Sequence, residues 1–199
     1  MPDDAPRPPR GTARASILAS AARLFYTEGI RSVSADRILA DTGTTKVTFY
    51  RHFPSKEDLV VAYLDLQSAQ VRTEFERIRA AAPGPGAALR DIASAVGGQA
   101  CRPGFRGCAF INAAAEYPEA GHPVRLAVER HRSWLRGLAV ELLGELGLED
   151  PGPAADQLMM LRDGAMVHGY VADGAGVADA LIHAGASIVA SYPGGRPRV

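Results

Sequence analysis

Apolar residues recur along most of this chain at the three- and four-residue spacing of a helix, and no stretch alternates every second residue as a strand does. In the first such stretch, 12–27, Ile17, Ala21, Leu24 and Phe25 fall on one helical face. Further helices are predicted over 55–81, 87–97, 108–117, 123–146, 154–172 and 178–191. With two short helices described next, the pattern predicts an all-α protein of about nine helices.

The stretch 34–53 is predicted to form two short helices joined by a tight turn. Ser34 has the residue type of an N-cap for the first helix. Gly43 can adopt the left-handed conformation that ends it, and Thr44 or Thr45 can cap the second helix. Two helices that cross steeply through a short glycine-containing turn form a helix-turn-helix, and its second helix can enter a major groove of DNA.

The second helix of this motif has side chains suited to contacts with double-stranded DNA. Hydroxyls can reach phosphates or base edges, cations can pair with phosphates, and Val47 can contact a thymine methyl. Phe49 is expected to point back into the small domain. The predicted DNA-binding residues are Arg14, Ser34, Thr44, Thr45, Lys46, Thr48, Tyr50, Arg51, His52 and Lys56. The alternative interpretation is an ordinary pair of surface helices.

The run GTTKVTFYRHFPSKEDL at residues 43–59 resembles the signature of the tetracycline-repressor (TetR) family of bacterial transcription regulators. That signature usually reads close to G-V-S-K-G-T-L-Y-x-H-F-x-S-K-E-x-L. The resemblance covers 12–59, about a quarter of the chain, and Val47 departs from it where the family usually has Gly or Ala. The resemblance implies a homodimeric repressor released by a small-molecule effector. Because a twofold dimer presents two recognition helices, its operator is expected to be palindromic.

Breaks in the helical pattern predict how the chain is divided. The clearest break is the Pro/Gly run at 82–86. The predicted parts are a flexible arm at 1–11, a helix-turn-helix DNA-binding domain at 12–54, a linking helix at 55–82, a helical ligand-binding and dimerisation domain at 83–192, and a tail at 193–199.

Polar residues within the apolar C-terminal helices suggest a site for an apolar or amphipathic ligand. Asn112 and Glu116 are four residues apart and share a helical face. A buried Glu116 needs a partner, which could be Arg162, a ligand or, as the favoured interpretation, a structural hydrogen bond. The predicted ligand-binding residues are Phe110, Asn112, Glu116, Trp134, Met159, Met166, His168 and Tyr170. The alternative for Trp134 is an ordinary core position, and His131 is expected to be a core histidine.

The last two helices, 154–172 and 178–191, are apolar around more of their surface than one stripe. A helix of that kind is buried on two sides. We therefore expect these helices to form a four-helix interface in a homodimer, with small residues such as Gly185 allowing close approach. A buried pair of helices within one chain is the alternative.

Composition narrows the function classes. The net charge is zero, but residues 1–52 contain eight Arg or Lys against five Asp or Glu, a balance of +3. Both lysines of the chain, Lys46 and Lys56, lie in or beside the predicted DNA-binding motif.

The two cysteines, Cys101 and Cys108, are expected to be reduced and structural, with a redox switch as the alternative. No membrane segment or signal peptide is visible, so a cytoplasmic location is expected.

No residue pattern predicts a catalytic site, a metal site or a cofactor. The five histidines lack paired metal-ligand spacing, and no glycine-rich phosphate loop follows a strand. The chain is therefore expected not to be an enzyme. Two alternatives remain, a dimeric small-molecule-binding module without operator binding and an enzyme built on the same helical scaffold.

Overall fold

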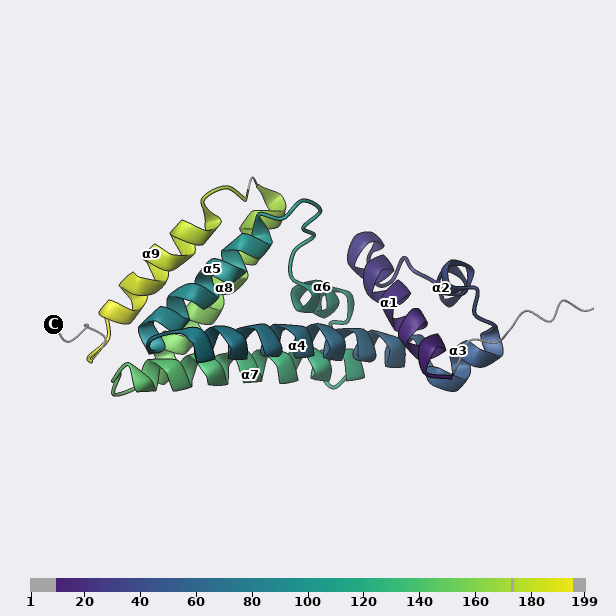
Figure 1. Ribbon diagram of the computed structural model, residues 1–199, viewed down its shortest axis with the longest axis horizontal. Helices are drawn as coiled ribbons and strands as arrows, with labels where there is room; N and C mark the ends of the chain where they lie inside the picture. Colours follow the sequence, from purple (N-terminus) through teal and green to yellow (C-terminus); the bar gives the residue numbers. More distant parts are fainter. Residues whose placement is uncertain (1–9, 173, 195–199) are drawn as a thin grey trace, which may run out of the picture.

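The computed structural model describes residues 10–172 and 174–194, and the regular elements in those ranges are nine helices (Figure 1). The predicted all-α fold is confirmed. The helices are α1 (Arg10–Glu28), α2 (Ala35–Thr42), α3 (Lys46–His52), α4 (Lys56–Ala81), α5 (Pro85–Ala100), α6 (Ala109–Glu116), α7 (Pro123–Glu145), α8 (Pro151–Val171) and α9 (Val177–Ala190). The predicted arm up to residue 9 and the predicted tail from 195 onward lie outside the described residues.

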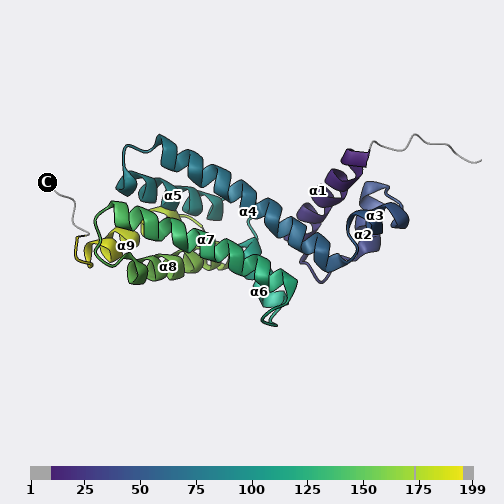
Figure 2. The same ribbon diagram turned by 90° about the horizontal axis from the view of Figure 1, so that it is seen from below.

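The molecule is elongated, with α1, α2 and α3 packed together around one end of α4 (Figure 1). Helix α4 has 26 residues, so at about 1.5 Å per residue it extends roughly 40 Å. Helix α7 lies along α4 in both views, and α5, α8 and α9 pack at the end of the molecule away from α3 (Figure 2). Helix α6 packs on α7 and α4, and in Figure 1 it lies above α4 on the side of α1 that faces α5.

Helix α1 begins at Arg10, inside the predicted arm, and α5 and α8 each extend three residues beyond a predicted end. Helix α5 was predicted to end at residue 97 but continues to Ala100. A Cβ atom added at Gly97 would lie 2.3 Å from the Cα of Ala178, so α5 and α9 cross too closely for a side chain at that point. This packing outweighs the low helix propensity of the adjacent glycines. Helix α8 begins at Pro151 within a predicted loop, because proline is well suited to the first helical turn and Asp150 caps the helix.

The N-terminal core follows the predicted apolar face of the first helix. Ile17, Ala21, Leu24 and Phe25 are all buried, and the Phe25 ring packs edge-on against Tyr63 of α4 at 5.7 Å between centroids. The buried cluster runs without interruption from α1 through α4 to α9. The small N-terminal bundle is therefore packed directly onto the start of the long helix.

His131 of α7 is a buried core histidine, as expected from sequence. Its ring stacks on Phe110 with 3.6 Å between centroids, and its Nδ1 lies 2.9 Å from the hydroxyl of Ser68. Burial lowers the pKa of His131 to about 3, and the nearby cations Arg162 and Arg72 add to this effect. The imidazole is therefore neutral in the folded protein at neutral pH.

Acidification is expected to destabilise the protein through His131. The unfolded chain takes up the proton near pH 6.5 and the folded chain only near pH 3, so stability present above pH 6.5 is lost as the pH falls. The expected loss is up to roughly 1.4 kcal/mol per pH unit. Urea unfolding at several pH values measures it. His131→Gln should remove most of this slope, and His183→Gln, which changes an exposed histidine, should keep it. An unchanged slope in His131→Gln would contradict the assignment.

Candidate nucleic-acid interface

Side-chain caps and a left-handed glycine fix the turn between α2 and α3. The Ser34 hydroxyl accepts a hydrogen bond from the backbone N–H of Arg37 at 3.1 Å, which begins α2. Gly43 has φ of 65°, the left-handed conformation that ends a helix. Thr45, rather than Thr44, caps α3 by accepting from the backbone N–H of Thr48 at 3.3 Å. The local signals in the sequence therefore define this helix-turn-helix.

Helix α3 has one buried face and one exposed face. Phe49 is fully buried beside Phe53, and the two rings lie 6.3 Å apart. Val47 and Tyr50 are exposed by 78% and 48% on the opposite side. Phe49 thus holds the helix against the domain while its neighbours in sequence are available to a partner.

Lys46 adds a positive charge to this exposed face. Its ammonium group lies 2.9 Å from the carboxylate of Asp36 on α2, and both side chains are mostly exposed. The hydrogen bond to Asp36 raises the pKa of Lys46, so the side chain is a cation at neutral pH. Exposed ion pairs contribute little to stability. A DNA phosphate can therefore replace Asp36 at little cost to the fold.

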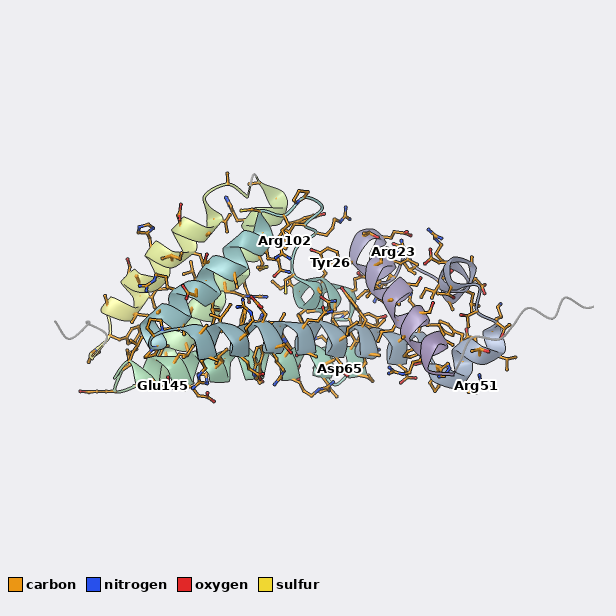
Figure 3. The ribbon with its side chains drawn as sticks, viewed as in Figure 1. Arg23, Tyr26, Arg51, Asp65, Arg102 and Glu145 are labelled. Atoms are coloured by element: carbon orange, nitrogen blue, oxygen red, sulfur yellow. The ribbon has the colours of Figure 1, made fainter. Side chains whose placement is uncertain are left out.

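Of the other predicted DNA-binding residues, some are exposed and some are partly buried. Arg51 is exposed at the end of the molecule formed by α3 (Figure 3), and Arg14 is exposed with its guanidinium over the Phe53 ring. Thr44 and His52 are partly buried. Lys56 is also partly buried, and its ammonium group donates to the backbone carbonyl of Arg31 at 3.3 Å. Burial lowers the pKa of Lys56, and the side chain is held against the domain.

Hydrogen bonds join the helix-turn-helix domain to α6. The carboxylate of Glu116 accepts from the backbone N–H groups of Ile30 at 3.0 Å and Arg31 at 2.6 Å. The favoured structural hydrogen bond of Glu116 is therefore confirmed. Tyr26 projects from α1 toward the segment before α6 (Figure 3). Its hydroxyl accepts from the N–H of Arg106 at 2.9 Å and donates to the carbonyl of Gly107 at 3.1 Å. No sequence pattern indicated these contacts, because they join positions about eighty residues apart.

Comparisons with known proteins identify the family. The family model described as "Bacterial regulatory proteins, tetR family" matches residues 17–63. The chain is 41% identical to SCO4454, a TetR-family transcriptional regulator from Streptomyces coelicolor, across 91% of this chain and 96% of that one, and the two structures agree with a TM-score of 0.87. The chain belongs to the TetR family. It is also 23% identical over 158 residues to the HTH-type transcriptional regulator YjdC of Escherichia coli, covering 77% of this chain and 81% of YjdC.

Membership of the TetR family makes this protein a DNA-binding transcriptional regulator, which agrees with the exposed face of α3. YjdC and a second matching relative, LmrA of Bacillus subtilis, are both HTH-type transcriptional regulators. Among residues 10–172 and 174–194, no helix is long and apolar enough to cross a membrane, and no cluster of His, Cys, Asp and Glu could hold a metal ion.

In this TetR-family protein, α4, α5, α7, α8 and α9 line a cavity of about 670 Å³. Of the eight residues predicted to bind a ligand, Met159 is the one that lines it. Phe110 stacks on His131, Trp134 packs near Phe75 at 6.2 Å, and Asn112 donates to the carbonyl of Arg106. These three side chains therefore have structural contacts outside the cavity wall.

The remaining ligand predictions are not brought to the cavity either. Met166 is buried elsewhere in the core, and His168 and Tyr170 are exposed on α8. The predicted ligand-binding residues did not include the wall contributed by α5 and α9, to which Ile92, Val96 and Leu181 belong. Their apolar periodicity was visible, but periodicity does not show which helices enclose an empty space.

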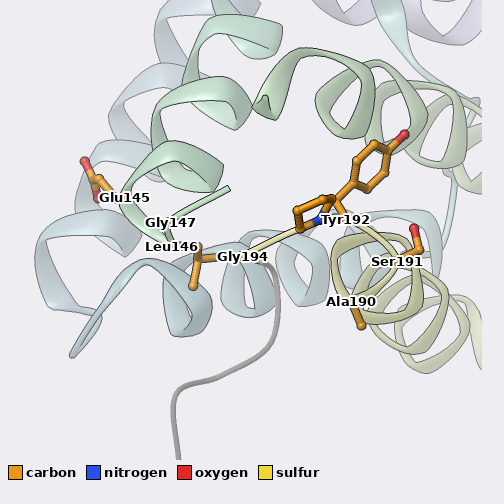
Figure 4. A pocket seen from close by; sticks show the side chains of 8 residues that line it. Glu145, Leu146, Gly147, Ala190, Ser191, Tyr192 and Gly194 are labelled. Atoms are coloured by element: carbon orange, nitrogen blue, oxygen red, sulfur yellow. The ribbon is translucent and has the colours of Figure 1, made fainter. Parts of the chain in front are cut away.

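A second hollow, of about 760 Å³, lies between the turn after α7 and the end of α9 (Figure 4). Its lining includes two glycines, Gly147 and Gly194, and the exposed side chains of Glu145 and Ser191. Glu145 is already paired with Arg79. This hollow therefore offers no buried polar group to a ligand, and the cavity among α5, α8 and α9 is the better candidate.

Proposed function

We propose that the protein is a cytoplasmic homodimeric repressor that binds a palindromic operator and is released by a small apolar or amphipathic ligand. The exposed face of α3, with Lys46, Val47 and Tyr50 projecting from a helix anchored by Phe49, is the observation that carries this proposal. Such a helix can read base edges in a major groove while its cation contacts phosphate. The small bundle around it fixes its orientation.

An exposed apolar stripe on α8 supports self-association. Met160, Val167 and Val171 are exposed by 66%, 49% and 75%, and they lie on one face of the helix at spacings of seven and four residues. Tyr170, beside that stripe, is exposed by 50%. Contiguous exposed apolar side chains of this kind mark protein-protein contacts. A second copy of the chain placed on α8 and α9 would cover them and present two α3 helices to DNA.

The cavity and the α6 contacts support regulation by a ligand. A volume of about 670 Å³ lies within the range of roughly 300–1,000 Å³ typical of small-molecule sites. Helix α6 packs on α7 at one side, and Glu116 at its end holds the backbone of Ile30 and Arg31. A ligand that favours a different position of α6 would shift the DNA-binding domain and, by linkage, lower DNA affinity.

Replacing Glu116 by glutamine is expected to loosen the DNA-binding domain at the point where α6 holds it. A glutamine lacks the charge and keeps one acceptor for two donors, so amide exchange at Ile30 and Arg31 should accelerate roughly tenfold or more. Hydrogen exchange followed by mass spectrometry or NMR measures this. Glu119→Gln, which changes an exposed acid with no such bond, is the matched control. Unchanged protection of the two amides in Glu116→Gln would rule out this role.

The function is tested by titrating the protein onto DNA from upstream of its own gene while its oligomeric state is measured by analytical ultracentrifugation. The proposal predicts a dimer that binds one discrete site with strong dependence on salt. A monomer, or a dimer with no preference for any fragment over random DNA, would contradict it.

A further inference from the structure

The cavity among α5, α8 and α9 has apolar walls and one largely buried cation, Arg162 of α8. The side chain of Arg162 is only 18% exposed. Two other charged residues reach the cavity, Arg90 and Glu145, and both are exposed. Glu145 is paired with Arg79. Arg162 is therefore the charge that a molecule inside the cavity would meet.

The guanidinium of Arg162 is poorly satisfied by the protein. Its Nη1 donates to the carboxylate of Asp163 at 2.9 Å, and its Nη2 points at the sulfur of Cys108 at 3.4 Å. Sulfur is a weak acceptor. Its Nε is buried and has no hydrogen-bond partner among the described residues. An arginine has five N–H donors, so most of those on Arg162 lack an oxygen partner.

The charges around Arg162 do not balance. Asp163 is shared, because its second oxygen accepts from Arg132 of α7 at 2.7 Å. Arg72 of α4 also faces this region, with its guanidinium over the Trp134 ring at 4.4 Å. Burial and the charges of these three arginines lower the pKa of His131, so its imidazole stays neutral. The carboxylate of Asp163 is thus paired with two cations, Arg162 and Arg132. A buried cation without a full counter-charge is unfavourable.

We propose that this cavity binds an amphipathic organic acid, with its carboxylate paired to Arg162 and its apolar part among α5, α8 and α9. The proposal rests on the proposed function in that it takes this cavity as the effector site. A carboxylate supplies the oxygen acceptors that Nε and Nη2 lack and can accept two parallel N–H bonds from a guanidinium. The apolar walls offer the carboxylate few other polar partners, and an ion pair in such surroundings is stronger than one in water.

The position of Arg162 also connects the ligand to the DNA-binding domain. Cys108, which Arg162 contacts, is the N-cap residue of α6. Glu116 at the other end of α6 holds Ile30 and Arg31. A carboxylate that pairs with Arg162 therefore competes with the contact between Arg162 and Cys108 at the start of α6. The acid would act on the same helix that positions the helix-turn-helix.

Calorimetric titration of the full chain with decanoate, decanol and decylamine, without DNA, tests the inference. These probes share one apolar chain and differ in charge. Decanoate should bind roughly tenfold or more tightly than decanol, because its carboxylate adds charged hydrogen bonds with the Arg162 guanidinium. Decylamine should bind weakest, because its ammonium group has the same charge as Arg162. Arg162→Gln should bring decanoate to the affinity of decanol. Arg136→Gln, which removes a cation paired with Asp156 outside the cavity, should leave the preference intact.

Equal affinity for decanoate and decanol, or no binding of any probe, overturns the inference. Both results are measured on the unmodified chain, so they do not require that a variant folds.

A second variant tests whether the acid binds in this cavity. Gly185 was expected at the dimer interface, but it lines the cavity, and a Cβ there would lie 3.6 Å from Leu158 of the same chain. Gly185→Leu should therefore fill the space and abolish binding of decanoate. Unchanged decanoate binding in Gly185→Leu also overturns the inference. The DNA titration distinguishes the two proposals: operator binding without decanoate binding refutes only the acid site, and decanoate binding that leaves DNA affinity unchanged refutes only regulation by ligand.

Discussion

Alanine at both Lys46 and Tyr50 is expected to weaken binding to the operator roughly tenfold to a hundredfold at matched salt. Both side chains project from the exposed face of α3, and neither is buried. Loss of the Lys46 cation should also lower the slope of log affinity against log salt by about one unit, because one fewer counterion is released. Fluorescence anisotropy at several salt concentrations measures both quantities.

Thermal unfolding should be nearly unchanged in that double variant, since the pair between Lys46 and Asp36 is exposed. Arg77→Ala serves as the control. It removes an exposed cation of α4 that pairs with Glu74 within the same helix, and it should leave operator binding as it was. Full operator affinity in the double variant would reject α3 as the recognition helix.

Alanine at Phe49 is expected to lower the free energy of unfolding by roughly 3–5 kcal/mol, the range for removing a buried phenylalanine. Phe49 is fully buried and lies near Phe53, so its loss leaves a cavity beneath α3. Chemical denaturation monitored by circular dichroism measures the change. DNA binding should fall as well, because the same ring fixes the orientation of the recognition helix.

Val47→Ala provides the comparison within the same helix. Val47 is 78% exposed, so its truncation should change stability by less than about 0.5 kcal/mol. A Phe49→Ala protein as stable as Val47→Ala would show that α3 is not held by this ring.

The helix-turn-helix could be predicted closely because its signals are local. Ser34, Gly43 and Thr45 act within three or four residues of their own position, as caps and as a left-handed terminator. The apolar period of α1 placed Ile17 and Leu24 in the core for the same reason. The exposed and buried faces of α3 then followed from its helical spacing.

The C-terminal helices could be predicted only in outline, because the cavity among them depends on contacts between distant elements. The cavity exists because α9 folds back on α5, and Gly97 allows the close crossing with Ala178. Nothing near Gly97 in the sequence indicates that partner. The sequence shows Glu116 as a polar residue on an apolar helix, but it does not show its partners. Glu116 accepts hydrogen bonds from backbone amides that lie before α2, more than eighty residues away. Arg162 was considered as the partner of Glu116, whereas it pairs with Asp163 beside the cavity.

The most direct test of the central claim is methylation protection of the bound operator by dimethyl sulfate, which modifies guanine N7 in the major groove and adenine N3 in the minor groove. A twofold pair of α3 helices predicts protected guanines in two half-sites about 34 Å apart, or a multiple of one helical turn. The Lys46→Ala/Tyr50→Ala protein should give weaker protection at the same protein concentration. Protection confined to adenines, or a single unpaired site, would contradict binding by two recognition helices in the major groove.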